Sequence, residues 1–322
     1  MSNKNVCVIG AGYWGGKHIR TLHKLGYLGG IVESDQETLN RFTKQYPEVK
    51  GFLSLDGALK DDCFKGFTVA TPAETHYSLA KQVMKAGKPV LVEKPFVLQK
   101  NHAEELVHIS EQNHVNLMVG HVLLFHPAIK KIKELIVEGK IGNLQYIYSN
   151  RLNLGQARTK ENVFWSFAPH DISIFQYFTD SVPKTIHARG STFIQKGIHD
   201  STMTQFKYPN GVEGHIFVSW LHPFKEHRLV VIGSEAMITF DESILDKPLK
   251  LYSKKINMIK GVPEKYDGPV SVINYDQKMA LTEELKYFTS HLESKTLTIA
   301  NGKHALEVTK ILVLSNEQLN CN

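Results

Sequence analysis

A glycine-rich hexapeptide near the N-terminus constrains the fold more than any other stretch of the chain. Gly10-Ala11-Gly12-Tyr13-Trp14-Gly15 has the pattern GxGxxG, follows the apolar run of residues 5–10 and opens a helical pattern that ends at Gly26. In such a turn the first glycine allows the sharp bend, the second lets the backbone approach a pyrophosphate, and the third lets the helix pack on the strand. The free N–H groups at the helix start then face the phosphates. The hexapeptide therefore predicts a dinucleotide-binding unit in which Gly10, Gly12, Tyr13, Trp14 and Gly15 line the cofactor.

The first part of the chain alternates between short apolar runs and helical patterns. This alternation predicts strands that pair in parallel and a doubly wound sheet with helices on both faces. The predicted strands are residues 5–10, 29–33, 67–71, 89–93 and 116–120, and the predicted helices are 14–26, 35–47, 76–87 and 101–113.

The pattern changes after about residue 125, where long alternating runs with turn signals begin. Pro209-Asn210-Gly211 is a strong hairpin turn, because Asn-Gly tolerates positive φ at both central positions. These runs predict an antiparallel sheet with one open face and one helix-covered face. The runs are residues 145–154, 185–194, 202–220, 228–241 and 249–253, and the covering helices are expected at 126–136, after His170 and at 278–294.

The fold class expected is thus an α/β Rossmann domain followed by an α+β domain with a large open-faced, mostly antiparallel sheet. We place the dinucleotide-binding domain at residues 1–122 and the substrate-binding and oligomerisation domain at residues 123–322. The last helical pattern, residues 302–319, is expected to pack back on the first domain.

Composition excludes several other classes of function. The net charge of +6 comes from basic residues that are mostly scattered along the chain. The one cluster is formed by Lys130, Lys131 and Lys133, and it is predicted to lie on the solvent-exposed side of an amphipathic helix. No nucleic-acid partner is therefore expected, whereas a mild positive bias suits an anionic small molecule. No apolar run approaches the roughly 20 residues of a membrane span.

The N-terminus enters a strand at once, which predicts no signal peptide. Three widely spaced cysteines form no disulfide framework or metal pattern and favour a reducing, cytoplasmic location. Cys7 is interpreted as a small buried hydrophobe. No metal site is predicted.

The second predicted strand ends at Glu33, 18 residues after Gly15. A carboxylate there can accept hydrogen bonds from the adenosine ribose and repels a 2′-phosphate, which favours NAD over NADP. Ser34 is small and could tolerate a phosphate, and no arginine stands next to it in the sequence. Thr71 and Pro72 follow a later strand, where a loop should cross the cofactor. His76, at the end of the same TPAETH segment, is interpreted as a packing or helix-start residue within that cofactor-binding loop.

Glu93-Lys94-Pro95 stands directly behind the apolar run of residues 89–92. Buried strands rarely carry ionisable residues unless the strand ends there, so we place Glu93 and Lys94 at the mouth of the cofactor site. Oxidation of an alcohol needs a base within hydrogen-bond reach of the hydroxyl. An amine that is partly desolvated beside a cationic nicotinamide has a lowered pKa and can act near neutral pH. The alternative for Lys94 is a surface lysine at a strand end.

The motifs GAGYWG, TPAETH, VEKP and PHD together resemble the Gfo/Idh/MocA (glucose–fructose oxidoreductase / inositol dehydrogenase) superfamily over essentially the whole chain. The resemblance implies that Lys94 is catalytic, that Pro95 often forms a cis peptide, and that His170 in the second domain completes the site. It also implies that the open sheet pairs two chains, giving a homodimer or homotetramer. The chain departs from the family at Ser166, where many relatives have an Asp one helical turn before the histidine.

Several polar residues are candidates for substrate contact. Arginines can hold a carboxylate or phosphate in a fork, and asparagine side chains suit sugar hydroxyls. Ser166 has the alternative role of capping a helix that Pro169 enters. The candidates are Arg151, Asn153, Arg158, Asn162, Trp165, Ser166, His121 and His126.

Within the superfamily, HVLLFHPAI, RLNLG and WSFAPHDI resemble dehydrogenases of nucleotide-linked sugars, UDP-N-acetylglucosaminuronic acid 3-dehydrogenases among them, which serve surface-polysaccharide synthesis. The resemblance implies an NAD-dependent interconversion of a secondary alcohol and a ketone on a sugar. Three alternatives stay open: a dehydrogenase of a free polyol such as inositol, a glycosidase that uses bound NAD transiently, and a non-catalytic NAD-binding protein. Retention of Lys94 and His170 argues against the last.

Overall fold

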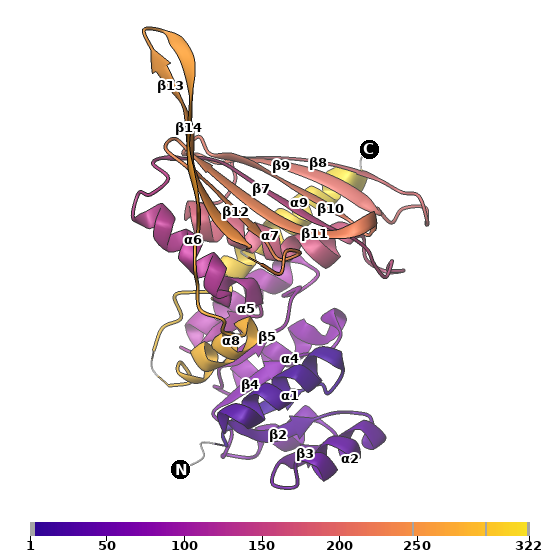
Figure 1. Cartoon of the computed structure of the whole chain (residues 1–322). Coiled ribbons are helices and arrows are strands. Elements are labelled where there is room, and N and C mark those ends of the chain that lie inside the picture. The colour runs from indigo at the N-terminus through magenta and orange to yellow at the C-terminus, as the bar shows by residue number, and fades with distance from the viewer. Residues whose placement is uncertain (1–3, 247, 294, 321–322) are drawn as a thin grey trace. The chain divides into compact units, whose positions relative to one another are not determined.

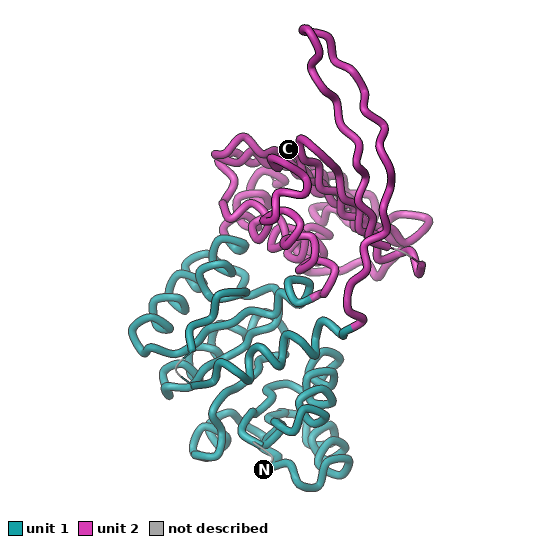
Figure 2. The backbone as a smooth tube through the Cα atoms, turned by 60° about the vertical axis from the view of Figure 1, so that its left-hand side comes forward, with its two compact units in different colours: residues 1–125, 278–309 teal, residues 126–277, 310–322 magenta. Residues whose placement is uncertain are grey.

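A computed structural model describes residues 4–246, 248–293 and 295–320 of the chain (Figure 1). The chain folds into two compact units (Figure 2). Unit 1 comprises residues 1–125 and 278–309, and unit 2 comprises residues 126–277 and 310–322. The chain thus leaves unit 1, builds most of unit 2, and returns to unit 1 before it ends in unit 2.

Unit 1 is built on a six-stranded parallel sheet with the order β3-β2-β1-β4-β5-β6. The order reverses between β1 and β4, and ligands bind beyond the carboxyl ends of the strands at such a point. The strands are β1 (Val6–Ile9), β2 (Leu28–Val32), β3 (Lys50–Phe52), β4 (Gly66–Val69), β5 (Val90–Val92) and β6 (Leu117–Val119).

Helices cover this sheet, which explains why its strands are apolar without alternation. All residues of β1, β5 and β6 are buried. The helices of unit 1 are α1 (Tyr13–Leu25), α2 (Gln36–Gln45), α3 (Leu55–Leu59), α4 (Ala73–Lys85), α5 (Lys100–Gln112), the 3-10 helix η1 (Val122–Phe125) and α8 (Ala280–Thr289), joined by the start of α9 (Gly302–Asn320).

The glycine-rich turn lies where the sequence predicted it, between β1 and α1. Helix α1 ends at Gly26, whose φ of 77° and N–H bond to the His23 carbonyl form the expected left-handed C-cap. The short β3 and α3 were not predicted, because segments of three and five residues are too short to show a hydrophobic period.

Unit 2 contains an eight-stranded sheet with the order β14-β13-β12-β11-β7-β10-β9-β8. Its neighbours are antiparallel except β7 and β10, which run parallel, so the predicted fold class is confirmed. The strands are β7 (Leu144–Leu154), β8 (Thr185–Ser191), β9 (Ser201–Lys207), β10 (Glu213–Ser219), β11 (Leu221–Gly233), β12 (Met237–Asp241), β13 (Leu249–Ile259) and β14 (Val262–Val272).

The hairpin predicted at Pro209-Asn210-Gly211 joins β9 to β10, and Gly211 has a φ of 85°. Strands β13 and β14 extend beyond the rest of their sheet as a long two-stranded hairpin (Figure 2). Most of β14 is exposed. It was not predicted, because a strand exposed on both sides shows no apolar alternation.

One face of the unit 2 sheet is covered by α7 (Val163–Thr179), which packs on β7, β9 and β10 and against α6 (Pro127–Val137). The end of α9 joins it, since the Gln318 side chain bonds the backbone of β8 at Ile186 and Ala188. The other face carries half-exposed aromatic groups, including Tyr148 stacked on His215. The predicted open face is therefore present.

Two details of the prediction for unit 2 were wrong. The covering helix does not begin after His170 but at Val163, with Pro169 inside it. Residues 280–289 do not cover this sheet either, because α8 belongs to unit 1 and packs on α1 and η1. An amphipathic pattern shows that a helix is half-buried and does not show which domain buries it.

None of the helices among the described residues is both long enough and apolar enough to cross a membrane. Cys7 is a buried free thiol, as predicted, and Cys63 is an exposed one. Cys321 lies outside the described residues.

Candidate active site

The glycine turn has the geometry that a dinucleotide needs. Gly10 has a φ of 89°, and a Cβ on Gly15 would lie 1.9 Å from the Gly10 carbonyl oxygen, so the helix can approach the turn only without a side chain. Gly12 is the N-cap of α1 and makes no side-chain capping bond, and a Cβ built on it would face open space. First-turn N–H groups of α1 are thus directed at an unobstructed surface, where an anion is stabilised.

Glu33 lies beside this turn at the end of β2. Its Oε2 accepts a hydrogen bond of 2.7 Å from the Ala11 N–H, and its Oε1 accepts one of 3.0 Å from the Asp35 N–H. The Ser34 hydroxyl lies 3.3 Å from the same Oε1. Glu33, the turn and one side of α2 line a cleft of about 580 Å³. These residues fit the adenosine half of a dinucleotide, whose ribose hydroxyls would meet the carboxylate.

Two arginines share that cleft, which the sequence did not reveal. Arg20 on α1 and Arg41 on α2 line it together with Glu33. Arg41 is eight residues from Glu33 in sequence, and it reaches the cleft because the first two turns of α2 bring it back. No arginine stands next to Ser34 in the sequence, but the fold brings Arg20 and Arg41 to the cleft that Glu33 lines.

Two aromatic residues flank the turn on α1, the exposed Tyr13 and the half-buried Trp14. The side chain of Tyr13 is 77% exposed, and the Lys17 amine lies over both the Tyr13 and Trp14 rings, 4.4 and 4.1 Å from their centroids. Both rings thus lie beside the turn, and their contact with a cofactor stays a prediction.

Thr71 and Pro72 follow β4, and Pro72 is the N-cap of α4. His76 on the first turn of α4 is buried between two loops. Its Nδ1 lies 2.9 Å from the Pro95 carbonyl oxygen, and its Nε2 lies 2.9 Å from that of Thr71. The imidazole therefore ties the loop after β4 to the loop after β5.

Lys94 lies two residues beyond the end of β5, and the Lys94–Pro95 peptide is cis, as the family resemblance implied. Glu93 is buried and turns its side chain into unit 1, where the His18 Nε2 lies 2.8 Å from its Oε1. The Glu93 Oε2 accepts the Lys94 backbone N–H at 3.1 Å. Glu93 thus supports the backbone of Lys94 from inside unit 1, and its contact with a cofactor stays a prediction.

His121 follows β6 and shares the surroundings of Lys94. Burial first, and then the positive charges of His304 and Lys94, hold the pKa of His121 well below its usual value. His121 is thus a neutral imidazole at neutral pH, packed edge-to-face on His304 with 5.5 Å between centroids. The sequence made His121 a candidate for substrate contact; its side chain is buried, and substrate contact stays a prediction.

His170 lies on α7 in unit 2 and is half-buried. The N-cap of α7 is Asn162, whose Oδ1 accepts the Trp165 N–H at 3.1 Å. The alternative role of Ser166 as a helix cap is therefore wrong. The Ser166 hydroxyl instead donates to Glu161 Oε1 at 2.7 Å. Trp165 is half-buried on the first turn of the same helix.

Arg151 on β7 has an internal carboxylate partner. Its Nε and Nη2 lie 2.9 and 3.1 Å from the two carboxylate oxygens of Asp171, which is 1% exposed and also accepts the Ser149 hydroxyl at 2.6 Å. The sequence made Arg151 a candidate for binding a substrate anion. In the structure its guanidinium group is directed at Asp171 on α7.

Glu242 and His227 extend this network. The Glu242 carboxylate lies 3.8 Å from Arg151 and 3.3 Å from His227. Burial acts to raise the pKa of Glu242, but the hydrogen bond to His227 and the charges of Arg151 and His227 outweigh it and bring the pKa to about 2. The network therefore keeps a carboxylate ionised on the same side of unit 2 as Arg151.

The remaining candidates divide between surface and structural positions. Arg158 is exposed and lies 3.7 Å from Glu161, and Asn153 is half-buried on β7. His126 is the N-cap of α6, because its Nδ1 accepts the Ala128 N–H at 3.2 Å. Its ring also packs on Phe240, with 5.2 Å between centroids.

Comparison with known proteins gives the class to which this fold belongs. Residues 4–121 match the NAD-binding Rossmann domain of the Gfo/Idh/MocA oxidoreductase family, and residues 129–239 match the C-terminal domain of the same family. The chain therefore belongs to the Gfo/Idh/MocA family of oxidoreductases.

Individual relatives share the whole architecture at low identity. UDP-N-acetylglucosamine 3-dehydrogenase of Acidithiobacillus ferrooxidans is 23% identical over 94% of this chain and 93% of its own length. Its structure has a TM-score of 0.86 at 21% identity and covers 98% of this chain and 97% of the other. The NADP-dependent D-xylose 1-dehydrogenase of Haloarcula marismortui is 22% identical over 93% of this chain and 86% of its own.

A structure of GenD2 from gentamicin A biosynthesis in complex with NAD has a TM-score of 0.81 at 21% identity, covering 99% of this chain and 94% of that one. These likenesses show the fold.

Proposed function

We propose that the protein is an NAD-dependent dehydrogenase that interconverts a secondary alcohol and a ketone on a nucleotide-linked sugar. The observation that carries the proposal is the position of Glu93-Lys94-Pro95 at the carboxyl end of β5, two strands from the glycine turn of β1 in the same parallel sheet. Catalytic groups in such sheets lie at this edge, next to the dinucleotide.

Lys94 is proposed as the base that takes the hydroxyl proton. When bound, the nicotinamide ring accepts the hydride from carbon. A base positioned on the hydroxyl oxygen supplies about 10²–10⁴-fold in rate. His121 can neither supply a second positive charge nor compete for that proton, because burial keeps it neutral. His170, from unit 2, is proposed as the second polar group on the hydroxyl.

The cofactor proposed is NAD. The Glu33 carboxylate at the end of β2 supports this, since it would repel a 2′-phosphate at close range. Arg41 in the same cleft is the group that could hold NADP if Glu33 were absent. NADP is thus the second candidate.

The nucleotide-linked sugar is proposed from three features. The relative that acts on UDP-N-acetylglucosamine matches almost the whole of both chains. The net charge of +6 favours an anionic ligand. Arg158 lies exposed in the segment between β7 and α7 and is available to a phosphate or uronate. A role in surface-polysaccharide synthesis belongs to the same proposal.

The open face of the unit 2 sheet is proposed to pair two chains into a homodimer or homotetramer in the cytoplasm. Light scattering tests this directly, because a monomeric mass at micromolar concentration contradicts it.

The function itself is tested with NAD and a substrate panel. The panel holds UDP-N-acetylglucosamine, UDP-linked uronic acids, inositol and free hexoses, and NADH formation is followed by absorbance. NADH from a UDP-sugar alone supports the proposal. NADH from inositol or a free hexose contradicts the nucleotide-sugar assignment. If no compound gives NADH and the denatured protein releases no bound cofactor, the dehydrogenase assignment is wrong.

A further inference from the structure

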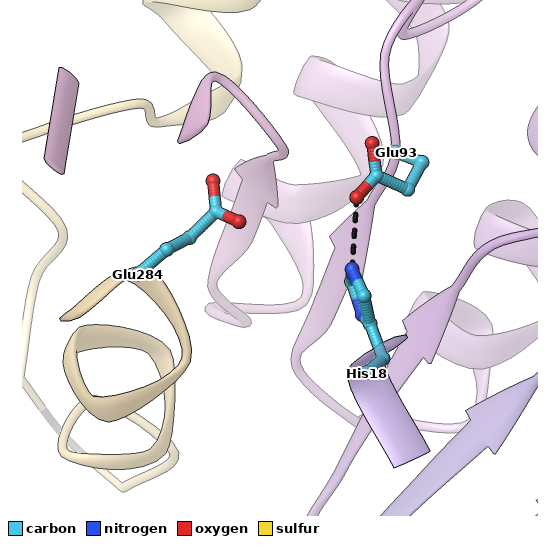
Figure 3. Close-up of side chains that lie close together, drawn as sticks. All are labelled: His18, Glu93 and Glu284. Carbon is cyan, nitrogen blue, oxygen red and sulfur yellow. Dashed lines mark hydrogen bonds and ion pairs between the residues drawn. The ribbon is translucent and has the colours of Figure 1, made fainter. Parts of the chain in front are cut away.

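Three titratable side chains from distant parts of the sequence meet inside unit 1 (Figure 3). His18 lies on α1, Glu93 directly follows β5, and Glu284 lies on α8. Their exposed fractions are 0%, 6% and 0%. One nitrogen or oxygen atom from each lies within 4.8 Å of the corresponding atoms of the other two. Figure 3 shows Glu284 turned toward the His18–Glu93 pair.

The hydrogen bond between His18 and Glu93 fixes the tautomer of the histidine. The His18 Nδ1 is buried and has no partner among the described residues. An N–H group there would be a buried unmatched donor, which is costly, whereas a bare lone pair is tolerated more easily. The ring proton therefore lies on Nε2 and is donated to the Glu93 Oε1, 2.8 Å away. With the Lys94 N–H on its other oxygen, Glu93 is the carboxylate of the cluster.

Glu284 is in the opposite situation. Both of its carboxyl oxygens are buried, and neither has a hydrogen-bond partner in the described part of the chain. An ionised carboxylate without a partner is strongly disfavoured in such a place. Burial first, and the negative charge of Glu93 second, raise the pKa of Glu284 well above its usual value.

On α1, η1 and α8, the described residues supply no cation that faces Glu284. Helix α8 packs on α1 and η1. From α1, the buried titratable side chain is His18, while Lys17 lies over the Tyr13 and Trp14 rings. The η1 segment, Val-Leu-Leu-Phe, contains no titratable residue. On α8 itself, Glu283 and Lys286 pair with each other at 3.0 Å, and the exposed Lys286 lies outside the core.

We propose that Glu284 keeps a proton in the folded protein and directs it at Glu93, so that the three side chains share one negative charge and fix the segment that carries Lys94. A carboxyl–carboxylate hydrogen bond spans about 2.5–2.7 Å, and one intervening water bridges a longer separation. Since neither Glu284 oxygen has a hydrogen-bond partner among the described residues, the water-bridged arrangement is the one that fits the separation within 4.8 Å. Glu284 is then a positioning residue that acts through Glu93, and this role for Lys94 rests on the function proposed above.

A proton explains the cluster better than a metal ion. A metal-binding histidine normally donates its second ring N–H to an acceptor, and the His18 Nδ1 has none among the described residues. The Nε2 atom, which faces the cluster, already bonds Glu93.

The proton is tested by the pH dependence of unfolding in wild-type protein and in Glu284→Gln, whose amide does not titrate. A carboxyl that is protonated when folded and ionised when unfolded loses stability as pH rises above its unfolded pKa, which is about 4.3. The ratio of the two unfolding constants should therefore change about tenfold per pH unit, with the wild type losing stability relative to the variant. Glu283→Gln, on the same helix but paired with the exposed Lys286, is the control and should show no such change.

A flat or reversed ratio overturns the proposal. If Glu284→Gln fails to fold, infrared spectroscopy of the wild type at neutral pH decides, since a protonated buried carboxyl has a C=O band apart from carboxylate absorption. Absence of that band overturns the assignment, and so does a stoichiometric metal ion whose removal by a chelator lowers stability.

The positioning role has its own test. Glutamine can still donate a hydrogen bond to Glu93, whereas leucine cannot. We expect Glu284→Leu to lower kcat at least tenfold with the Kd for NAD unchanged, and Glu284→Gln to restore kcat to within a few-fold of the wild type. Equal kcat in the leucine variant contradicts the role. If the wild type turns over no substrate, the proposed function fails, while the unfolding and infrared measurements still decide the proton.

Discussion

Replacement of Gly15 by alanine tests whether the turn after β1 binds a dinucleotide by close approach of its backbone. The new Cβ would lie 1.9 Å from the Gly10 carbonyl oxygen and 2.7 Å from the Gly10 carbonyl carbon, and neither atom can rotate away. Since a non-bonded contact needs more than 3 Å, α1 must move by over 1 Å from the turn. Overpacking of this kind costs about 1–3 kcal/mol or more. We expect a lower Tm and a loss of NAD affinity of at least about tenfold.

Gly16→Ala is the matched control on the next residue of α1. Its Cβ would lie 3.4 Å from the end of the Phe42 ring, which can shift, and alanine favours the helix by up to about 1 kcal/mol over glycine. This variant should keep its Tm, because its new side chain meets no backbone atom. The affinity is measured by calorimetric titration with NAD, and the Tm by thermal unfolding without ligand. Gly15→Ala with wild-type affinity and Tm would refute the role assigned to the turn.

Three further predictions concern charged groups. Glu33→Ser removes the carboxylate that opposes a 2′-phosphate and leaves Arg41 in the cleft, so the NADP-to-NAD ratio of kcat/KM should rise at least about tenfold; an unchanged ratio would show that Glu33 does not select the cofactor. Asp171→Ala removes both hydrogen bonds of the buried Arg151 guanidinium to Asp171 and leaves it only the Glu242 carboxylate at 3.8 Å, which should lower the free energy of unfolding by about 3–5 kcal/mol in urea titration; a loss below about 1 kcal/mol would contradict the burial of this pair. Glu242, with a pKa of about 2, contributes stability that is complete above the unfolded pKa and is lost as pH falls toward 2, about 3 kcal/mol in all; the difference from Glu242→Gln should shrink over that range, and a difference that stays constant with pH would refute the assignment.

The first unit was predictable because its signals are local. The glycine turn, the C-cap at Gly26 and the apolar runs each depend on neighbours in sequence, and the parallel pairing follows from their alternation with helices. The Pro209-Asn210-Gly211 hairpin was predictable for the same reason. Local signals failed for β3, which is too short to show a period, and for β14, which is exposed along most of its length.

Parts of the candidate site depend on contacts between distant residues, and these the sequence did not reveal. Arg151 was assigned to a substrate, but its pairing with Asp171 depends on how α7 packs on β7. Arg41 reaches the Glu33 cleft only through the turns of α2. The His18–Glu93–Glu284 cluster joins three segments far apart in the chain, and Glu284 sits in a helix that was assigned to the other domain. A single sequence contains no signal that pairs such positions.

The most direct test of the central claim is the rate of NADH formation from NAD and a UDP-sugar by wild-type protein and by Lys94→Met. Methionine keeps the length of the side chain and removes the base. We predict that the wild type forms NADH with a UDP-sugar, and that Lys94→Met lowers kcat by about 10²–10⁴-fold while its Kd for NAD stays within a few-fold of the wild type. Undiminished kcat in Lys94→Met would contradict the claim that Lys94 takes the proton.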